Sequence, residues 1–352
     1  MKQKTEQLHF QLPTQDCWSH IWRQPAFKFM YSNHHNGERF LNSLPRPEGP
    51  RRADLFKWLI TRKSSTWKMD VNNNEHAESA PAKRAIPQDR PEASIDDWKV
   101  WFVGHATVLL QIGPYNLLTD PVWGEYASPK QGKGPKRVIP AGIALEELPT
   151  IHAVLLSHNH YDHMDLTTLQ WLHDKFAMPI YTGLGNSWYL PKSFHVLEMD
   201  WWQSSLLHDL KIIYTPAQHF SGRGLRDQNR ALWGGFSVLA GQDHCFFAGD
   251  TGYSPHFKEI QSRLGAPRIS LLPIGSYEPR ELMRYMHLNP QDAFQAHQDL
   301  RSKCSLAIHY RTFQLTDESR EQPELDLKVA MKNTSKLMTP FICVREGRRL
   351  VV

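Results

Sequence analysis

The sequence predicts an α/β protein in which helices cover layers of β-sheet. From Asp97 onward, short runs rich in Val, Ile, Leu and Phe alternate with breaks that contain Gly, Pro or His. Such runs are typical of β-strands separated by tight turns. Longer stretches between several of the later runs indicate helices. Strand groups with interspersed helices pack as sheets covered by helices, although this pattern leaves the strand order open.

The strands and helices follow from local composition. The runs WKVWFV, ATVLLQI and YNLLTD are separated by Gly-His and Gly-Pro breaks. The run HAVLLS is almost wholly apolar, as expected of a buried strand, and DLTTLQWLHDKF follows it as a helix. The expected strands cover residues 98–103, 106–112, 115–120, 152–157, 211–216, 235–240, 244–249, 269–274 and 305–310, and the expected helices cover 165–176, 255–264, 290–302 and 324–334.

The chain divides into an N-terminal part, residues 1–94, and a larger domain, residues 95–352. Residues 1–37 lack clear periodicity, which predicts a partly ordered arm. The segment ADLFKWLITRK, residues 53–63, predicts a short amphipathic helix that either packs on the domain or touches a membrane surface. Residues 64–94 are rich in Asn, Ala, Pro and charged residues, as expected of a linker or loosely packed loop.

Composition excludes several classes of protein. The 352 residues, 40% of them hydrophobic, suffice for a large core and exclude a wholly disordered chain. No apolar run approaches the roughly 18 residues of a membrane span, and the first residues contain no signal-peptide core. The 4 cysteines lie far apart without a CxxC pair, which indicates reduced thiols in a cytoplasmic protein. The net charge of +5 fits an anionic partner without requiring one.

Five of the 19 histidines lie at the ends of expected strands. Directly after HAVLLS, the segment HNHYDH places His158, His160, Asp162 and His163 within six positions. Imidazole nitrogens and carboxylate oxygens are ligands for zinc, iron or manganese. The i, i+2 spacing of His158 and His160 lets an extended segment point both side chains the same way. The pattern therefore predicts a metal site.

Three later strand ends supply further ligands. His219 follows one strand, Asp250 follows another, and His309 closes a third. Either histidine could complete the ligand set of one ion, and Asp250 could lie between two ions. A histidine at a single strand end is more often structural, but this series of clusters indicates two metal ions.

At this point the sequence resembles the metallo-β-lactamase superfamily, and within it the N-acyl-phosphatidylethanolamine-hydrolysing phospholipases D and their bacterial relatives. The resemblance covers about Arg39 to Thr316 and implies an αββα sandwich of two mixed sheets with a dinuclear metal site at one edge. The segments that carry it are WFVGHATVLLQ, LLTDPVW, ASPKQGKGPKR, LLSHNHYDHMD, LEMDWWQ, TPAQHFSGR, ALWGGFSVL, FFAGDTGYSP, LLPIGSYEPR and YMHLNPQDA.

The resemblance implies a role for each ligand. Two divalent metal ions are expected, with zinc as the first expectation. One ion would be held by His158, His160 and His219. The other would be held by Asp162, His163 and His309, and Asp250 would bridge the two. Asp162, Asp250 and His287 would act in catalysis, with His287 aiding the substrate or leaving group; a packing or surface role for His287 stays open as the less favoured alternative.

Further residues would support the site or bind substrate. Asp120 and His105 are expected to orient ligands, although Asp120 alone reads as a turn residue before a proline. Tyr277 and Arg280 would line the substrate pocket or form a plain loop. Gln131 would lie near the lipid head group. Some family members carry an aromatic residue after this glutamine, where the chain has Gly132, which leaves the head-group preference open.

The resemblance implies a phosphodiesterase of the phospholipase D type, yielding phosphatidic acid and N-acylethanolamine from N-acyl-phosphatidylethanolamine or a related glycerophospholipid. Two close cations lower the pKa of a shared water and stabilise charge on phosphorus. A hydrolase for another phosphodiester or a sugar-phosphate lactone stays open, as does a non-catalytic regulator that binds metal or lipid. The phospholipid partner would be met at a membrane surface by a cytoplasmic or peripheral protein. Nucleic acid is not expected, and a homodimer is left open.

Overall fold

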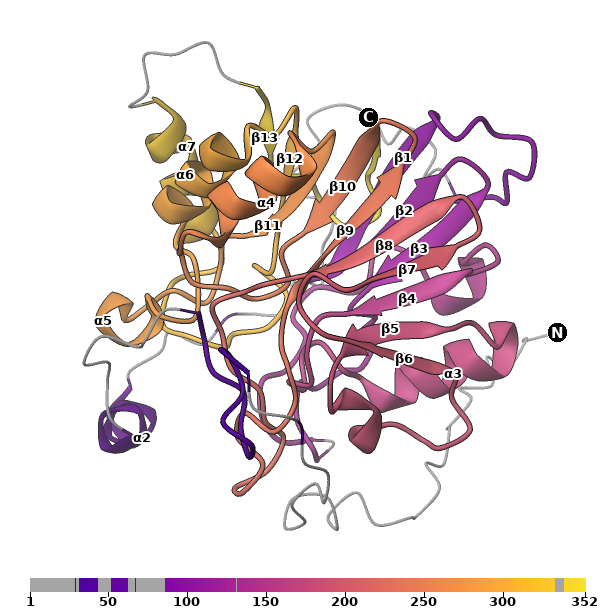
Figure 1. Cartoon of the computed structure of the whole chain (residues 1–352). Helices are drawn as coiled ribbons and strands as arrows, with labels where there is room; N and C mark the ends of the chain where they lie inside the picture. Colours follow the sequence, from indigo (N-terminus) through magenta and orange to yellow (C-terminus); the bar gives the residue numbers. More distant parts are fainter. Residues whose placement is uncertain are drawn as a thin grey trace, which may run out of the picture.

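Two seven-stranded sheets form the centre of the computed structural model, and helices lie on their outer sides (Figure 1). The structure describes residues 29, 32–43, 52–62, 67, 86–130, 132–332 and 339–352. Both sheets are mixed, with antiparallel and parallel neighbours. This arrangement of two mixed sheets between helices confirms the predicted fold class.

The first sheet contains the strands that follow the N-terminal part of the chain, together with the last strand. Its neighbours pair antiparallel from β14 to β3 and parallel from β3 to β6. The C-terminal strand pairs with the first one, with Val351 opposite Lys99. The order across the sheet is β14 (Arg349–Val351), β1 (Trp98–Gly104), β2 (Thr107–Ile112), β3 (Tyr115–Thr119), β4 (Ala153–Leu156), β5 (Ile180–Gly183) and β6 (Val196–Met199).

The second sheet is built from the later strands. It pairs antiparallel from β7 to β10 and parallel from β10 to β13. Parallel neighbours end at the same edge of a sheet, so the loops after β10 and β12 emerge together. The order is β13 (Phe341–Ile342), β12 (Ser305–Ile308), β11 (Ile269–Pro273), β10 (Asp243–Phe247), β9 (Gly235–Ala240), β8 (Leu210–Thr215) and β7 (Ser204–Leu207).

Two of the helices begin at a residue whose side chain caps the first turn. The Asp165 side chain accepts a hydrogen bond from the Thr167 amide at the start of α3, and Asn289 does the same for the Asp292 amide at the start of α6. In Figure 1, α3 lies beside the first sheet and α4, α6 and α7 lie beside the second. The helices are α2 (Arg52–Thr61), α3 (Leu166–Phe176), α4 (His256–Leu264), α5 (Arg280–Met283), α6 (Pro290–Leu300) and α7 (Gln322–Lys332), with 3₁₀ turns at Leu145–Glu147 and Asn186–Tyr189.

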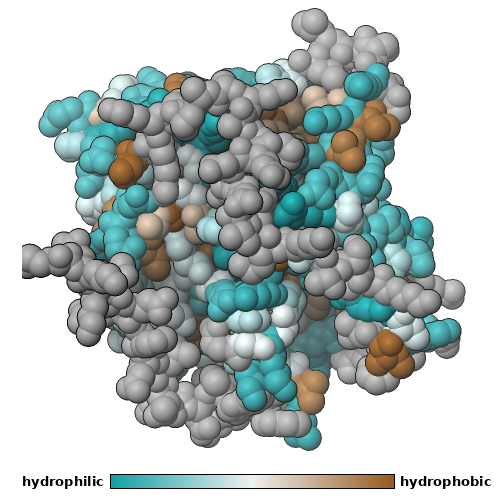
Figure 2. All heavy atoms as spheres, turned by 180° about the vertical axis from the view of Figure 1, so that it is seen from behind, coloured by the Kyte–Doolittle hydropathy of each residue, from teal (hydrophilic) through white to brown (hydrophobic). Residues whose placement is uncertain are grey.

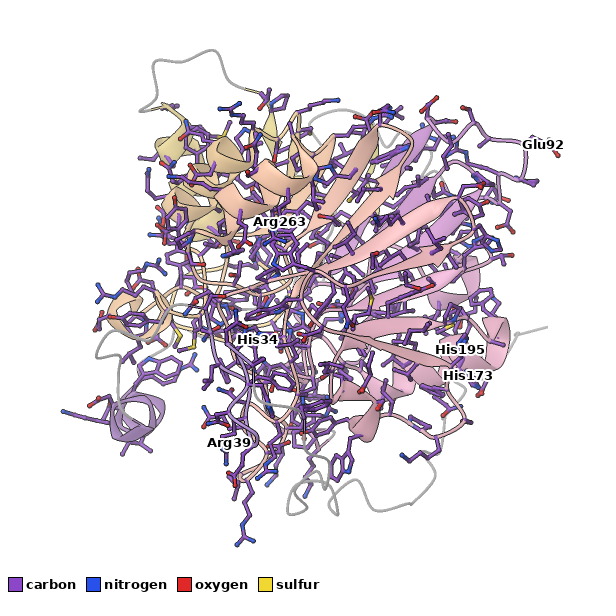
Figure 3. The ribbon with its side chains drawn as sticks, viewed as in Figure 1. His34, Arg39, Glu92, His173, His195 and Arg263 are labelled. Carbon is purple, nitrogen blue, oxygen red and sulfur yellow. The ribbon has the colours of Figure 1, made fainter. Side chains whose placement is uncertain are left out.

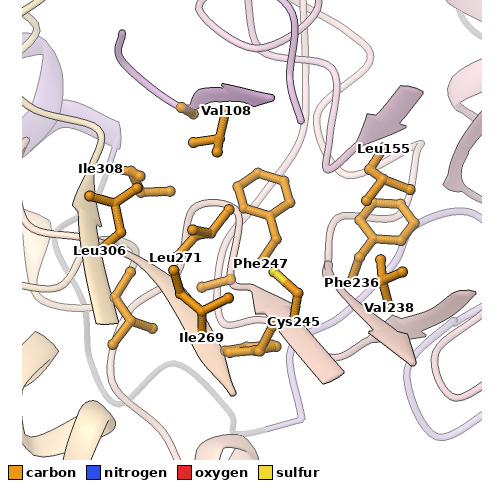
Figure 4. Packing of buried hydrophobic residues seen from close by; sticks show 14 of the residues in the cluster. Val108, Leu155, Phe236, Val238, Cys245, Phe247, Ile269, Leu271, Leu306 and Ile308 are labelled. Atoms are coloured by element: carbon orange, nitrogen blue, oxygen red, sulfur yellow. The ribbon is translucent and has the colours of Figure 1, made fainter. Parts of the chain in front are cut away.

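The largest core lies between the two sheets. Successive side chains of a strand point to opposite faces, so Val108 and Leu110 of β2 join this core while Leu109 joins the cluster that includes α3. In Figure 4, Val108 and Leu155 of the first sheet face Phe236 and Phe247 of the second. The sandwich is therefore held together by side chains from both sheets.

Replacing Phe236 with alanine is expected to lower the free energy of unfolding by about 3–5 kcal/mol. Phe236 is fully buried in the inter-sheet core, and its ring centroid lies 5.0 Å from that of Tyr214. Denaturant unfolding of the metal-stripped protein measures the change. Leu206→Ala is the matched control, because this side chain is 73% exposed and its loss is expected to change the unfolding free energy by less than about 0.5 kcal/mol.

Residues 32–43, one of the described parts of the N-terminal region, pack on the domain. Phe40 is fully buried, and the His34 ring stacks on Trp201 with a centroid distance of 4.7 Å. His34 Nε2 also lies 2.7 Å from a carboxylate oxygen of Asp200. Figure 3 shows His34 near the middle of the view and Arg39 below it on the same segment. Most of the predicted arm and linker lies outside the described residues.

Exposed apolar side chains on the described surface are scattered. Ile60, Leu206 and Leu225 are the most exposed of the larger ones together with Val351. On the face drawn in Figure 2, hydrophilic side chains dominate the described surface and hydrophobic ones form small separate groups. Such isolated side chains are ordinary on globular proteins. The helices of the described residues fall short of the length and apolarity that a bilayer crossing requires.

Candidate metal centre

The predicted ligands meet at the edge that the two sheets share. The loop after β4, in the first sheet, carries His158, His160, Asp162 and His163. The other ligands come from loops of the second sheet: His219 follows β8, Asp250 follows β10 and His309 follows β12. Loops at the carboxyl ends of strands are the usual place for such a site in α/β proteins.

One group of three histidines has its ring nitrogens directed at a common point. His158 Nε2 lies 2.8 Å from His160 Nδ1, which lies 3.3 Å from His219 Nε2. An ion bound at about 2.0–2.1 Å to each nitrogen would hold tetrahedral ligands roughly 3.3 Å apart. Two of the remaining nitrogens have protein partners: His158 Nδ1 contacts Ser157 Oγ at 2.9 Å, and His219 Nδ1 donates to the Met286 carbonyl at 2.7 Å.

A second group surrounds Asp162. Its Oδ2 atom lies 3.3 Å from His163 Nε2 and 3.2 Å from His309 Nε2. His105 Nε2 contacts the same oxygen at 3.0 Å, so His105 lies in this group rather than behind it. All four side chains are buried. The group thus offers three nitrogens and one carboxylate within a small volume.

Asp250 lies between the two groups. Its Oδ2 atom is 3.2 Å from His163 Nε2 and 3.8 Å from His219 Nε2, and its Oδ1 atom is 3.2 Å from His309 Nε2. One oxygen therefore approaches a histidine of each group. This is the placement that a carboxylate shared by two ions requires.

Asp120 fixes the orientation of His163 from behind. The carboxylate is fully buried and accepts three hydrogen bonds: Oδ1 from the Ser157 amide at 2.7 Å, and Oδ2 from Ser157 Oγ and His163 Nδ1 at 2.6 Å each. With Nδ1 committed to this bond, Nε2 of His163 faces the site. These contacts would let Asp120 orient His163 as a ligand, which stays a prediction.

Burial keeps the first histidine group neutral. It lowers the pKa of His160 to about 3 and that of His219 to about 4, and it holds the pKa of His158 well below its usual value. Neighbouring imidazoles lower the pKa of His158 and His160 further. At neutral pH these rings therefore have free lone pairs, which metal binding requires.

The second group behaves differently because its histidines face two carboxylates, Asp162 within the group and Asp250 beside it. Burial alone would lower the pKa of His163 and His309, but Asp250 and Asp162 outweigh it, raising the pKa of His309 to about 9 and that of His163 well above its usual value. Burial likewise opposes the charged forms of Asp162 and Asp250, yet the facing histidines hold both pKa values well below the usual range. Without cations, the histidines thus neutralise the carboxylates.

The donor set fits two divalent cations. Among the described residues, His163 Nε2 and Asp250 Oδ1 are buried without a well-formed hydrogen bond, although each faces the centre. Buried polar atoms in proteins almost always have a partner. Cations between the two groups would satisfy both atoms, as well as the lone pairs of the first histidine group.

Cation binding at pH 7 is expected to release about two protons per chain. The facing carboxylates raise the pKa of His309 to about 9 and that of His163 well above its usual value, so both histidines carry a proton in the cation-free protein and must lose it to become ligands. The release should fall as the pH rises through about 9, since His309 then titrates before binding. Calorimetry in buffers of different ionisation enthalpy measures the number; binding at pH 7 without proton release would contradict the assignment.

The remaining predicted residues divide into two sets. His287 lies at the site, with Nδ1 3.8 Å from Asp250 Oδ2. Arg280 instead donates to the His287 carbonyl at 2.7 Å and pairs with Asp292, while Tyr277 is buried and donates to Asp326 at 2.6 Å. The polar groups of both side chains are therefore engaged within the protein, and their contact with substrate stays a prediction.

The basic segment SPKQGKGPKR, residues 128–137, contains two charged side chains that contact other parts of the protein. Gln131 lies outside the described residues. Lys136 pairs with Glu125 at 2.9 Å. Arg137 is buried, where its guanidinium donates to main-chain carbonyls, including that of Val122 at 2.8 Å, and stacks over Phe313. Arg137 thus supports the loop structure.

Asn42 supports the site although no role was expected for it. Its Oδ1 accepts from the His219 amide at 3.0 Å, and its Nδ2 donates to the His219 carbonyl at 2.8 Å. Trp233 Nε1 donates to the same Oδ1 at 3.0 Å. An asparagine so far along the chain from its partner gives no local signal, so only the fold reveals the contact.

Known proteins are similar to this chain in sequence and in fold. The beta-lactamase superfamily domain matches residues 115–310. The chain belongs to the metallo-β-lactamase superfamily. It is 32% identical over 317 residues to "N-acyl-phosphatidylethanolamine-hydrolyzing phospholipase D 1" of Caenorhabditis elegans, covering 85% of this chain and 87% of that protein.

Two further similarities span most of the metallo-β-lactamase domain. An uncharacterized protein of Mycobacterium tuberculosis is 34% identical over 269 residues, which are 73% of this chain and 70% of that protein. The structure of Igni18, a metallo hydrolase from Ignicoccus hospitalis, has a TM-score of 0.56 at 19% identity and covers 73% of this chain and 98% of its own. The superfamily membership and the His/Asp cluster together support a metal-dependent hydrolase.

Proposed function

We propose that the chain is a phospholipase D that hydrolyses N-acyl-phosphatidylethanolamine or a closely related glycerophospholipid. The observation that carries the proposal is the position of Asp250, within 4 Å of histidines from both ligand groups. Paired cations suit phosphodiester hydrolysis. Support for the lipid substrate comes from the C. elegans relative, whose name specifies N-acyl-phosphatidylethanolamine and whose similarity extends over most of both chains.

In this proposal, each of the two ligand groups described above would bind one cation. His158, His160 and His219 would hold one cation, Asp162, His163 and His309 would hold the other, and Asp250 would contribute to both. Zinc suits nitrogen-rich ligand sets, and the same donors accept iron or manganese. When bound, the two cations would supply an activated water and offset the negative charge of the phosphodiester.

The reaction exchanges one phosphorus–oxygen bond for another. The oxygen of water forms a bond to phosphorus, and the bond from phosphorus to the ethanolamine oxygen breaks. One proton of the water ends on the departing oxygen, which gives N-acylethanolamine and phosphatidic acid. His287 stands beside Asp250 with 12% of its side chain exposed, so its ring can hydrogen-bond a phosphodiester or departing oxygen that enters from that side.

Residues in contact with the ligands keep them in place during this reaction. Asp120 holds the ring of His163, and His105 contacts the Asp162 oxygen that faces two other histidines. Arg280 holds the carbonyl of His287. Such supporting contacts fix ring orientation and ligand basicity.

The lipid would be reached at a membrane surface. Helix α2 presents exposed Lys57 and Ile60, while Trp58 is half-buried and donates to Asp317 at 2.6 Å. An anchored helix with a cation and an apolar side chain on its outer face suits contact with an anionic lipid surface.

The test is lipid-class profiling by mass spectrometry after incubation with a mixed phospholipid extract. We expect loss of N-acyl-phosphatidylethanolamine with matching gains of phosphatidic acid and N-acylethanolamine. Parallel assays with bis-p-nitrophenyl phosphate and a lactone, each with and without chelator, separate the alternatives. Turnover of the lactone alone would contradict the proposed phosphodiesterase activity and support a lactonase. Metal-loaded protein that leaves the lipid, the phosphodiester and the lactone intact would exclude enzymatic activity on all three substrates.

A further inference from the structure

Arg223 joins the two loops that carry the first histidine group. It follows His219 by four residues in the loop after β8. Its Nη1 atom donates to the main-chain carbonyls of Asn159 and Met164, both at 2.9 Å. These two residues flank His160 to His163 in the loop after β4. A single guanidinium nitrogen therefore ties both ends of the main ligand loop to the segment that bears His219.

Further contacts connect the same two loops. The Arg223 guanidinium lies over the ring of Tyr161, with Cζ 3.9 Å from the centroid, and the Tyr161 hydroxyl donates to the Arg223 carbonyl at 2.9 Å. The Gly222 amide donates to Asn159 Oδ1 at 2.8 Å. Tyr161 stands between the ligands His160 and Asp162, so the contact reaches the middle of the ligand loop.

The backbone around Arg223 is itself fixed. Asp227, which is buried, accepts from the amides of Arg223 and Gly224 at 2.9 and 2.8 Å. The hydroxyl of Tyr189 donates to the same carboxylate at 2.9 Å. Arg223 thus projects from an anchored turn, which gives its side chain a defined position against the ligand loop.

We propose that Arg223 is a positioning residue for the cation that His158, His160 and His219 would hold. Loss of Arg223 weakens the binding of that cation more than the binding of the second cation. The inference rests on the metal site of the proposed function but not on the lipid substrate. His158 and His160 lie on one of the loops that Arg223 joins, and His219 lies on the other. If the loops separate, the spacing between His160 and His219 changes first.

The second cation would be affected less. Asp162 and His163 share the ligand loop, but their partner His309 follows β12, and His105 lies between β1 and β2. His163 is also held independently by Asp120. Neither β12 nor the turn before β2 is among the partners of the Arg223 guanidinium.

The experiment measures metal binding without substrate. The full chain is stripped of metal and titrated with Zn²⁺ against a chromophoric chelator, and then with Co²⁺, whose visible absorption reports ligand geometry. We expect Arg223→Met to weaken one of two binding steps by about 10- to 100-fold and to change the Co²⁺ spectrum. Arg223→Lys keeps a cationic donor and should recover part of the affinity. Arg226→Gln is the control, because Arg226 lies in the same turn with its side chain exposed.

The outcomes separate this inference from the proposed function. Equal affinities and spectra in the wild type and Arg223→Met would overturn the inference while leaving the metal site intact. Equal losses in both steps, or equal losses in the Met and Lys variants, would also overturn it, since Arg223 would then act through general packing. Circular dichroism of each metal-free variant corrects for the folded fraction, and a loss that this fraction fully explains counts against the inference. Wild-type protein that binds no metal would overturn the metal site itself.

Discussion

Asp250→Asn is expected to lower phosphodiester turnover by about 10³-fold, the factor that roughly 4 kcal/mol of lost transition-state stabilisation gives. Asp250 is the only carboxylate among the described ligands that approaches histidines of both groups, at 3.2 Å from His163 and His309 and 3.8 Å from His219. An amide keeps the shape but removes the negative charge that would be shared by two cations. Both ions would then bind more weakly and with altered spacing.

The rate should be measured at saturating Zn²⁺, so that a loss of affinity is distinguished from a loss of chemistry. Asp243→Asn is the matched control, because this carboxylate lies at the start of β10 and pairs with Lys303 at 2.7 Å outside the site. It should leave the rate within about twofold of wild type. A near-normal rate in Asp250→Asn would refute the assignment of a shared carboxylate.

Removal of metal is expected to abolish turnover and to lower the melting temperature. Ligand binding to the folded state adds stability by mass action, about 4 kcal/mol when the free ion is at 1,000 times its dissociation constant. The effect should be large here because one ligand loop comes from the first sheet and three come from the second, so the cations join the two sheets.

Activity and melting should both recover when Zn²⁺, Mn²⁺ or Fe²⁺ is returned, and the most active ion at matched occupancy indicates the one that the site prefers. Turnover that persists after elemental analysis shows the protein to be free of metal would contradict the proposed mechanism. Recovery of melting without recovery of turnover would support metal binding and count against phosphodiester hydrolysis.

The strands and ligands that could be predicted are those whose own residues form a clear pattern. Strands such as β2 and β4 are runs of apolar residues, and the ligand cluster after β4 combines four ligand residues, three histidines and one aspartate, within six positions. In contrast, β5 is four residues long, β7 begins with two serines, and β14 is three residues long. These strands were not predicted, because their conformation depends on hydrogen bonds to neighbours rather than on their own composition.

The metal centre likewise contains side chains that the sequence could predict and contacts that it could not. The ligand side chains could be predicted because each stands at the end of a recognisable strand. The contacts of Asn42 with His219 and of Arg280 with His287 could not, since both depend on main-chain groups that any residue would present. His105 was expected behind the ligands, but the close approach of the β1–β2 turn to β12, where the His309 amide donates to the His105 carbonyl at 2.8 Å, brings its ring into the second group.

The pairing of β14 with β1 has a consequence for the order of assembly during synthesis. Lys99 leaves the ribosome early, yet its strand partner Val351 is added much later. Until then, β1 has one open edge, with main-chain donors and acceptors free to pair with another chain. The nascent first sheet therefore spends most of translation with an exposed edge, and expression at reduced temperature or with chaperones should increase the yield of folded protein by limiting aggregation at this edge.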